Sequence, residues 1–198
     1  MSILREITLQ AQKHLQDQEV AIFIGARQAG KTTVLKQIQS YLIHQEEGAH
    51  FLNLEDPDYL KLLNESPKNL FKIFPFDFQK RTYVFIDEIQ YLRDPSNFLK
   101  FFYDEYKDKI KLLVSGSSAF YLDEKFKDSL AGRKKIFHVR TVSFREFLRF
   151  KNEDELSARD FKILTISDLE KINRYFEEYA IYGGYPRVVL AQIGRAHV

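Results

Sequence analysis

The sequence contains no cysteine among its 198 residues. This absence excludes disulfides, thiolate zinc sites and cysteine nucleophiles, and it is typical of a protein of the reducing cytoplasm. Long apolar runs are also missing, because the longest have only the length of a β-strand, and Met1–Leu15 carries charges throughout. We therefore expect a cytoplasmic protein with neither a signal peptide nor a membrane-spanning helix.

An excess of charge of one sign is missing too, since 30 Lys and Arg face 28 Asp and Glu and the formal net charge is +2. This balance by itself indicates neither nucleic acid nor a membrane as a partner.

Between residues 133 and 151, however, the single acid Glu146 stands among seven basic residues: Arg133, Lys134, Lys135, Arg140, Arg145, Arg149 and Lys151. This basic segment predicts either a DNA or RNA contact or a solvated protein face. The second is favoured, because the phenylalanines of the segment are interpreted as core residues rather than as stacking platforms for bases: Phe137, Phe144, Phe147 and Phe150.

Short apolar runs alternate with segments of helical spacing along the first part of the chain. Four of these runs have the length and composition of buried strands: Val20–Ile24, His50–Leu54, Tyr83–Ile86 and Lys111–Val114. A fifth, Lys135–Val142, alternates in the manner of an outer strand. Strands that alternate with helices indicate an α/β fold, here a parallel five-stranded sheet with helices on both faces.

The pattern after Ser143 is helical, over Ser143–Phe150, Ser167–Tyr182 and from Pro186 onward. Ser167 and Glu170 have capping-box spacing, and the polar stretch Asn152–Asp160 is interpreted as a linker. We therefore expect one domain over residues 1–151 and the start of a small helical lid over residues 161–192. Residues 193–198 look like a translated sequencing adapter, and we expect them to be a non-native tail.

One glycine-rich motif follows the first predicted strand and precedes a predicted helix. Residues 25–32 match G-x-x-x-x-G-K-[ST], the Walker A pattern of a P-loop. Its glycines let successive amides point at phosphate oxygens, Lys31 is expected to reach the β and γ phosphates, and the Thr32 hydroxyl is expected to ligate Mg²⁺. The residues expected to contact the nucleotide are Gly25, Ala26, Arg27, Gln28, Ala29, Gly30, Lys31, Thr32 and Thr33.

Two carboxylates end the third predicted strand, Tyr83–Ile86, as in a Walker B motif. Strand tips of an open parallel sheet are where ligands bind, so Asp87 is predicted to hold Mg²⁺ through its water shell. Glu88 is predicted to orient the attacking water as general base. The alternative is that Glu88 only caps a turn.

Two later segments supply further catalytic candidates. The fourth strand runs into Ser115-Gly116-Ser117-Ser118, from which we select Ser117 as a contact of the γ phosphate or the water. Arg133 follows Gly132 and is a candidate arginine finger, acting on its own site or on that of a neighbouring subunit. Ordinary turn serines and a surface arginine of the basic segment are the alternatives.

The motifs together predict Mg²⁺-dependent ATP binding and hydrolysis that drives a conformational change. ATP is favoured because the guanine-specific Asn-Lys-x-Asp pattern is absent, and the scattered histidines lack ligand spacing for any metal besides Mg²⁺. The alternative is a nucleotide-gated binding module with slow turnover, and a DNA contact through the basic segment stays open.

The series of motifs resembles that of the prokaryotic AAA-type ATPases of the AAA+ superclass, whose carboxyl half is a domain of unknown function. The resemblance spans about Leu4 to Leu190, and it includes Ser143–Phe147 and Tyr182–Arg187 besides the motifs above. It implies a helical lid in which Gly184, Tyr185 and Pro186 approach adenine. Members of this family usually continue for roughly as much chain again. We therefore leave open a homo-oligomer and a protein or DNA partner of the missing carboxyl half, and we expect no membrane partner.

Overall fold

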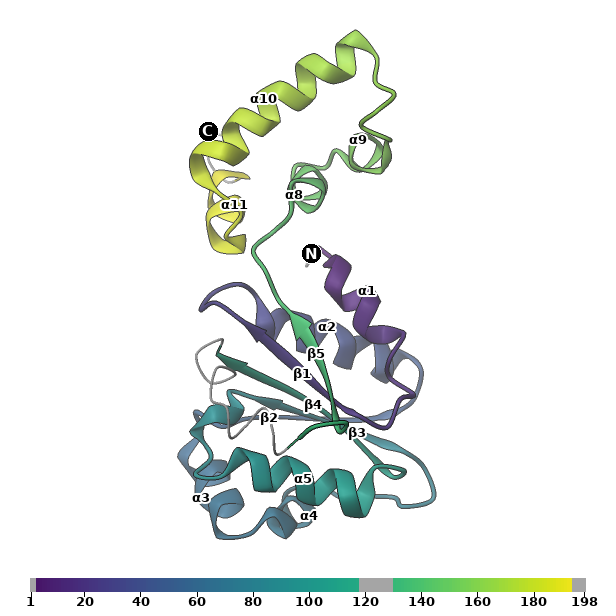
Figure 1. Cartoon of the computed structure of the whole chain (residues 1–198), viewed down its shortest axis with the longest axis vertical. Coiled ribbons are helices and arrows are strands. Elements are labelled where there is room, and N and C mark those ends of the chain that lie inside the picture. Colours follow the sequence, from purple (N-terminus) through teal and green to yellow (C-terminus); the bar gives the residue numbers. More distant parts are fainter. Residues whose placement is uncertain (1–2, 118–129, 194–198) are drawn as a thin grey trace. The chain divides into compact units, whose positions relative to one another are not determined.

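The computed structural model describes residues 3–117 and 130–193 of the chain (Figure 1). The chain divides into two compact units. The sheet unit consists of the described residues of two segments: Ile7–Arg27 and Lys31–Val139. The helical unit consists of the described residues of three segments: Met1–Glu6, Gln28–Gly30 and Arg140–Val198.

The sheet unit contains the predicted parallel five-stranded sheet, in the order β2-β3-β4-β1-β5. Its strands are β1 (Val20–Gly25), β2 (Gly48–Asn53), β3 (Thr82–Asp87), β4 (Ile110–Ser117) and β5 (Lys134–His138). β5 ends earlier than the predicted run to Val142, because the amide of Val139 makes a last bond to the carbonyl of Ile24 (2.7 Å) and the helical unit begins at Arg140.

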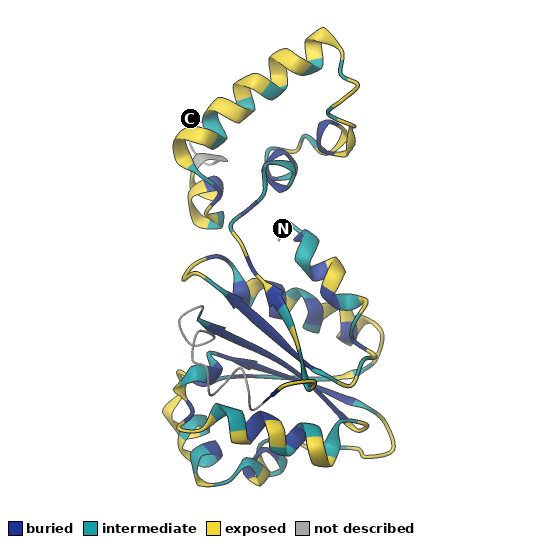
Figure 2. Ribbon diagram, in the orientation of Figure 1, coloured by how far each residue is buried: buried dark blue, intermediate teal, exposed yellow. Residues whose placement is uncertain are grey.

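The central strands are apolar on both sides because helices cover both faces of the sheet. Every residue of β3 is buried, and Figure 2 shows the central strands β1, β3 and β4 largely in dark blue between helices that are exposed on their outer sides. Val114 of β4 pairs with Ile22 of β1 and with Ile86 of β3. This register brings the carboxyl ends of β1, β3 and β4 to one edge of the sheet, where ligands of open α/β sheets bind.

Figure 1 shows α2 on one face of the sheet and α3, α4 and α5 on the other. The helices of this unit are α2 (Lys31–His44), α3 (Pro57–Glu65), α4 (Leu70–Ile73) and α5 (Pro95–Tyr106), with the short 3₁₀ turns η1 (Pro67–Asn69) and η2 (Ile89–Tyr91). Asp56 and Asp94 cap α3 and α5, and each is followed by proline in the first turn, the position where its missing amide costs least.

α1 (Glu6–Gln12) begins in the helical unit, which further contains α8 (Phe144–Phe150), α9 (Asp154–Ala158), α10 (Ile166–Tyr182) and α11 (Pro186–Ile193). Ser143 and Glu146 form a capping box at the start of α8, so this helix begins where the sequence predicts. A small core of Val142, Phe147, Phe150 and Val189 joins α8 to α11. The long carboxyl-terminal segment of this unit starts at Arg140, whereas the predicted first domain extends to residue 151. No helix in the described part of the chain is long and apolar enough to cross a membrane.

Two predictions for this unit need correction. The stretch Asn152–Asp160 is more than a linker, because α9 forms within it and buries Leu156. α10 is capped by Thr165 with Asp168, not by the Ser167 and Glu170 pair. Both pairs have capping-box spacing, but Asp168 also forms an ion pair with Arg159, which stabilises the earlier start.

Candidate nucleotide-binding site

The glycine-rich loop combines a close backbone approach with left-handed turns. A Cβ on Gly25 would lie 2.2 Å from the carbonyl oxygen of Val139, so only glycine allows the chain after β5 to pass so close. Gln28 and Gly30 have φ angles of 63° and 98°, in the left-handed region. Such turns direct successive amides into a concave anion site, and the free amino end of α2 follows directly. Of the other loop residues, Ala26 and Arg27 are exposed.

Lys31, the first residue of α2, has its amine on the inner side of this turn. It is 6% exposed, and its Nζ donates hydrogen bonds to the carbonyls of Gly25 (3.2 Å) and Ala26 (3.1 Å). A lysine ammonium carries three donors, so an amine anchored on two carbonyls can still bind a phosphate oxygen. Thr33, the last residue predicted to contact the nucleotide, is exposed on α2.

Thr32 and Asp87 join the two motifs. The Thr32 hydroxyl donates to Oδ2 of Asp87 at 2.6 Å, from the first turn of α2 to the last residue of β3. The other oxygen of this buried carboxylate, Oδ1, accepts from the hydroxyl of Ser115 on β4. Three elements therefore bring their side-chain oxygens to one point at the carboxyl edge of the sheet.

This oxygen cluster is compatible with Mg²⁺. The described residues contain no group of three or more His, Cys, Asp or Glu that could hold a metal by themselves. Mg²⁺ does not need such a group, because it keeps several waters and binds one or two protein oxygens together with substrate phosphates. The Thr32 hydroxyl and the Asp87 carboxylate are oxygen donors of that type, so they fit Mg²⁺ that accompanies a nucleotide.

Glu88 has an unusual backbone conformation directly after β3. Its φ and ψ are 58° and 50°, which is left-handed and costs a non-glycine residue on the order of 1 kcal/mol or more. Its side chain makes no capping bond to η2, contrary to the turn-capping alternative, and its carboxylate instead accepts from Nε2 of Gln90. Its amide donates to Ser115 Oγ at 3.0 Å. Strained residues of this kind cluster at functional sites.

Of the serines at the end of β4, Ser115 rather than Ser117 contacts the carboxylate at the candidate metal site. Ser117 lies at the same edge, where its amide donates to Oε1 of Gln90 at 3.4 Å. Ser118 lies outside the described residues. Ser115 and Gln90 are thus site residues that the sequence analysis did not predict, although Ser115 stands in the serine motif and Gln90 follows Glu88 by two residues. The sequence feature that could have identified them is the clustering of polar residues at the ends of β3 and β4.

Arg133 lies at the opposite edge of the sheet, so this placement argues against the first of its two predicted modes, action on its own P-loop, and leaves the mode on a neighbouring subunit open. Its carbonyl accepts from the amide of Val20, the first residue of β1, and its Nε pairs with Asp104 at 2.8 Å. The P-loop begins at the other end of β1, after Gly25. The five-residue step from Val20 to Gly25 along β1 separates Arg133 from the start of the P-loop by about 16 Å. Because β5 is parallel to β1, the residue preceding β5 must lie at the amino edge.

Pro186, by contrast, lies beside the P-loop turn. Its Cγ is 3.7 Å from the position that a Cβ on Gly30 would take, and both residues belong to the helical unit. The preceding segment is held by close packing, since a Cβ on Gly184 would lie 2.3 Å from the carbonyl oxygen of Val142. The amide of Val142 donates to the carbonyl of Gly184 at 2.6 Å.

The cations of the basic segment are largely engaged within the protein. Arg145 donates to the carbonyls of Ser157 and Arg159, and Lys151 pairs with Glu178. Phe137, Phe147 and Phe150 are buried, as the core interpretation of the segment expects, and Phe144 is partly buried against the core of the helical unit. These contacts favour the interpretation of the basic segment as a protein face over its interpretation as a nucleic-acid contact.

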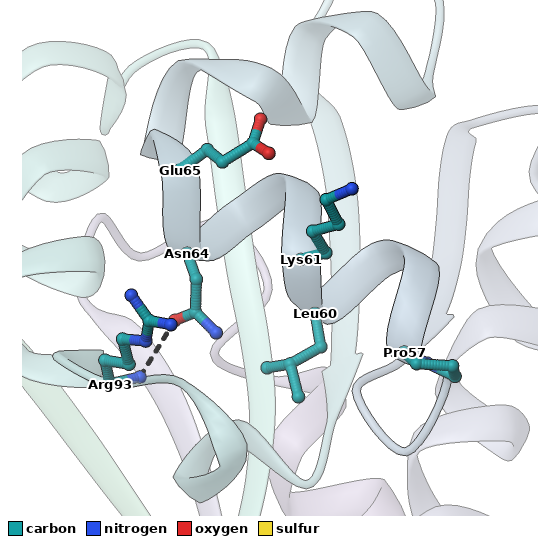
Figure 3. Close-up of a pocket in the computed structure, with 6 residues that line it drawn as sticks. All are labelled: Pro57, Leu60, Lys61, Asn64, Glu65 and Arg93. Carbon is teal, nitrogen blue, oxygen red and sulfur yellow. Dashed lines mark hydrogen bonds between the residues drawn. The ribbon is translucent and has the colours of Figure 1, made fainter.

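A hollow of about 430 Å³ lies beside α3 in the sheet unit (Figure 3). Its lining residues are Pro57, Leu60, Lys61, Asn64, Glu65 and Arg93. The amide of Arg93 donates to the side-chain oxygen of Asn64 at 2.9 Å. None of these residues belongs to the motifs above, so this hollow is separate from the P-loop site.

Comparison with protein families and sequences places the motifs in a known group. Residues 17–148 match the family described as AAA domain. An uncharacterised protein of Haemophilus influenzae is 28% identical over 195 residues, which are 96% of this chain and 45% of that protein. An uncharacterised protein of Methanocaldococcus jannaschii is 27% identical over 172 residues, which are 87% of this chain and 36% of that protein. The chain thus spans less than half the length of these relatives.

Solved structures share the fold at low sequence identity. AMPPCP-bound DnaA from Aquifex aeolicus has a TM-score of 0.59 at 13% identity and covers 98% of this chain and 59% of its own. A Saccharomyces cerevisiae Hsp104:casein complex has a TM-score of 0.60 at 20% identity, and the match covers 95% of this chain and 36% of the other chain. A P-loop and an acidic strand end lie at one edge of a parallel sheet, and the family match covers most of the chain. The chain therefore belongs to the AAA domain family.

Proposed function

We propose that this chain binds ATP together with Mg²⁺ and hydrolyses it, and that hydrolysis drives a conformational change. The observation that carries the proposal is the 2.6 Å hydrogen bond between Thr32 and Asp87. It brings a P-loop hydroxyl and a strand-end carboxylate, two residues of independent motifs, into one oxygen site.

The loop amides and Lys31 bind the phosphates in this proposal. The left-handed residues Gln28 and Gly30 turn the loop amides inward, and the buried Lys31 amine neutralises charge on the β and γ phosphates. Thr32 and Asp87 would hold bound Mg²⁺, which would neutralise the charge that develops on the β and γ phosphate oxygens.

Glu88 orients the attacking water and accepts its proton. The carboxylate is held by Gln90, whose other amide atom accepts from the backbone of Ser117. Gln90 therefore links the general base to the end of β4. Ser117, at this same edge, is proposed to position the water or the γ phosphate.

The position of Pro186 beside Gly30 supports a coupling between nucleotide state and the helical unit. The loop turn lies against the first residue of α11, so a change in the loop on loss of the γ phosphate reaches this helix directly. Pro186 is proposed to approach the nucleotide base from the same position. A homo-oligomer and a protein or DNA partner are proposals for the whole protein, because this chain spans less than half the length of its relatives.

The second candidate function is a nucleotide-gated binding module with slow turnover. It uses the same pocket, so turnover alone distinguishes the two. The deciding experiment measures phosphate release from ATP and GTP, with and without Mg²⁺. We expect release from ATP that requires Mg²⁺. Tight ATP binding without release would favour the binding module, and binding of neither nucleotide would contradict both.

A further inference from the structure

Arg5 is a buried cation whose guanidinium contacts three distant parts of the helical unit. The residue is 5% exposed. Its Nε donates to Oε1 of Glu146 at 2.9 Å, its Nη1 to the carbonyl of Ala29 at 3.1 Å, and its Nη2 to the carbonyl of Arg140 at 2.9 Å. One side chain thus ties the P-loop turn to the segment that leads into α8.

The bond to Ala29 determines which way a P-loop amide points. The carbonyl of Ala29 and the amide of Gly30 belong to the same planar trans peptide, so the two groups point in opposite directions. A donor that holds the carbonyl therefore directs the Gly30 N–H away from Arg5. A charged donor on the carbonyl also polarises the peptide and strengthens its N–H as a donor.

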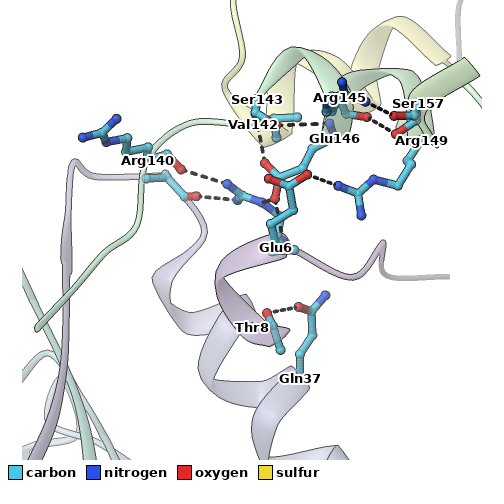
Figure 4. A network of polar contacts seen from close by, with 12 residues as sticks. Glu6, Thr8, Gln37, Arg140, Val142, Ser143, Arg145, Glu146, Arg149 and Ser157 are labelled. Atoms are coloured by element: carbon cyan, nitrogen blue, oxygen red, sulfur yellow. Dashed lines mark hydrogen bonds and ion pairs between the residues drawn. The ribbon is translucent and has the colours of Figure 1, made fainter. Parts of the chain in front are cut away.

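Glu146 in turn holds Arg5 in one orientation. Its Oε1 also accepts from the amide of Glu6 at 2.8 Å, and its Oε2 accepts from the amide of Ser143 at 2.9 Å. The residue is 3% exposed. Figure 4 shows Glu146 among Glu6, Ser143 and Arg149, and a second ion pair joins Arg149 to Glu6. The carboxylate is thus fixed from several sides, and it fixes the guanidinium through a buried ion pair.

We propose that Arg5 is a positioning residue of the P-loop, which orients the Ala29–Gly30 peptide for phosphate binding, and that Glu146 holds it in place. This inference rests on the proposed nucleotide binding. The proposed role requires the planar fork of arginine, because three different nitrogens of Arg5 donate to the three acceptors, whereas all three donors of a lysine lie on one nitrogen. A conservative change to lysine keeps the charge and removes the geometry.

The test compares Arg5→Lys with Arg149→Gln. Arg149 belongs to the same polar network through its ion pair with Glu6, whereas Arg5 itself donates to the P-loop carbonyl of Ala29. The measurements are the dissociation constant for Mg²⁺-AMPPCP, the rate of phosphate release from ATP and the melting temperature. We expect Arg5→Lys to weaken AMPPCP binding about tenfold and to slow release roughly a hundredfold, the loss typical of misplaced groups. Arg149→Gln is expected to stay within about twofold of the wild type, because it removes only a partly exposed ion pair.

Glu146→Asp provides a second variant, since it keeps the charge but withdraws the carboxylate from Arg5 by one methylene. We expect the same selective loss of AMPPCP affinity. Wild-type affinity and release in Arg5→Lys would overturn the inference, as would equal losses in Arg5→Lys and Arg149→Gln. Failure of both Arg5→Lys and Glu146→Asp to fold would also overturn it, because the pair would then act on stability alone. If the wild-type chain neither binds AMPPCP nor releases phosphate, the proposed function itself fails.

Discussion

The hydroxyl of Thr32 and the carboxylate of Asp87 lie 2.6 Å apart, although 55 residues separate them in the sequence. The contact arises because β3 and β1 end at the same edge of the sheet, separated by β4 alone. α2 starts immediately after the loop that follows β1. The candidate metal site is therefore a product of strand order, and the predictions below test its parts one by one.

Lys31→Ala is expected to abolish ATP binding or hydrolysis, because no other residue of the loop supplies a buried positive charge. Isothermal titration with ATP and a phosphate-release assay measure both effects. Lys36→Ala, an exposed lysine five residues further along α2, is the control and should behave as the wild type. Unchanged affinity and turnover in Lys31→Ala would contradict the P-loop assignment.

Asp87→Asn is expected to raise the Mg²⁺ concentration for half-maximal phosphate release about tenfold or more, because the amide keeps the shape but lacks the negative charge. The measurement is a Mg²⁺ titration of ATP hydrolysis. Asp58→Asn, an exposed residue of α3, is the control. An unchanged Mg²⁺ requirement would remove Asp87 from the metal site.

Glu88→Gln is expected to bind ATP almost normally and to hydrolyse it at least about a hundredfold more slowly, since the substitution removes only the basicity. Binding and single-turnover hydrolysis are measured on the same protein. Near-normal turnover would mean that the water is activated elsewhere, and Ser117 would be the next residue to test.

Arg133→Ala is expected to keep the hydrolysis rate of a single chain, because Arg133 lies at the amino edge of the sheet and pairs with Asp104. The exposed pair contributes only about 1 kcal/mol or less to stability. The measurement is phosphate release by the variant alone. A large loss would point to a neighbouring subunit, and mixing Arg133→Ala with Lys31→Ala protein would then restore activity.

Glu146→Gln is expected to lower the free energy of unfolding by about 3–5 kcal/mol at pH 7, because it leaves the Arg5 guanidinium buried without its partner. Burial raises the pKa of Glu146, but hydrogen bonds from Arg5, Ser143 and Glu6 outweigh it, and the pKa lies below its ordinary value of 4.5. The stability due to the carboxylate is therefore present above pH 4.5 and is lost as the pH falls through the folded-state pKa.

Urea unfolding of wild type and Glu146→Gln at pH 7 and at acidic pH checks this expectation. The difference between the two proteins should shrink in acid. Glu6→Gln, which breaks the half-exposed pair with Arg149, is the control and should cost about 1 kcal/mol or less at pH 7. A difference that is independent of pH would show that the charge of Glu146 does not contribute.

The sequence by itself determined the features that depend on neighbouring residues. The P-loop after β1, the acidic pair after β3 and the capping box of Ser143 with Glu146 each lie within about eight residues of chain. Alternation of apolar strands with helices was sufficient for a parallel sheet, because a parallel strand needs a crossover connection. Where two local patterns competed, as for the start of α10, the sequence contained no means of choosing between them.

Only the tertiary structure decided which distant residues meet. β4 lies between β1 and β3, which brings Ser115 to Asp87, and β5 lies beside β1, which leaves Arg133 at the edge away from the P-loop. Arg5 and Glu146 meet across 141 residues. Strand order and long-range ion pairs depend on how the elements pack in three dimensions. The periodicity of apolar residues and the spacing of motifs along the chain do not determine that packing.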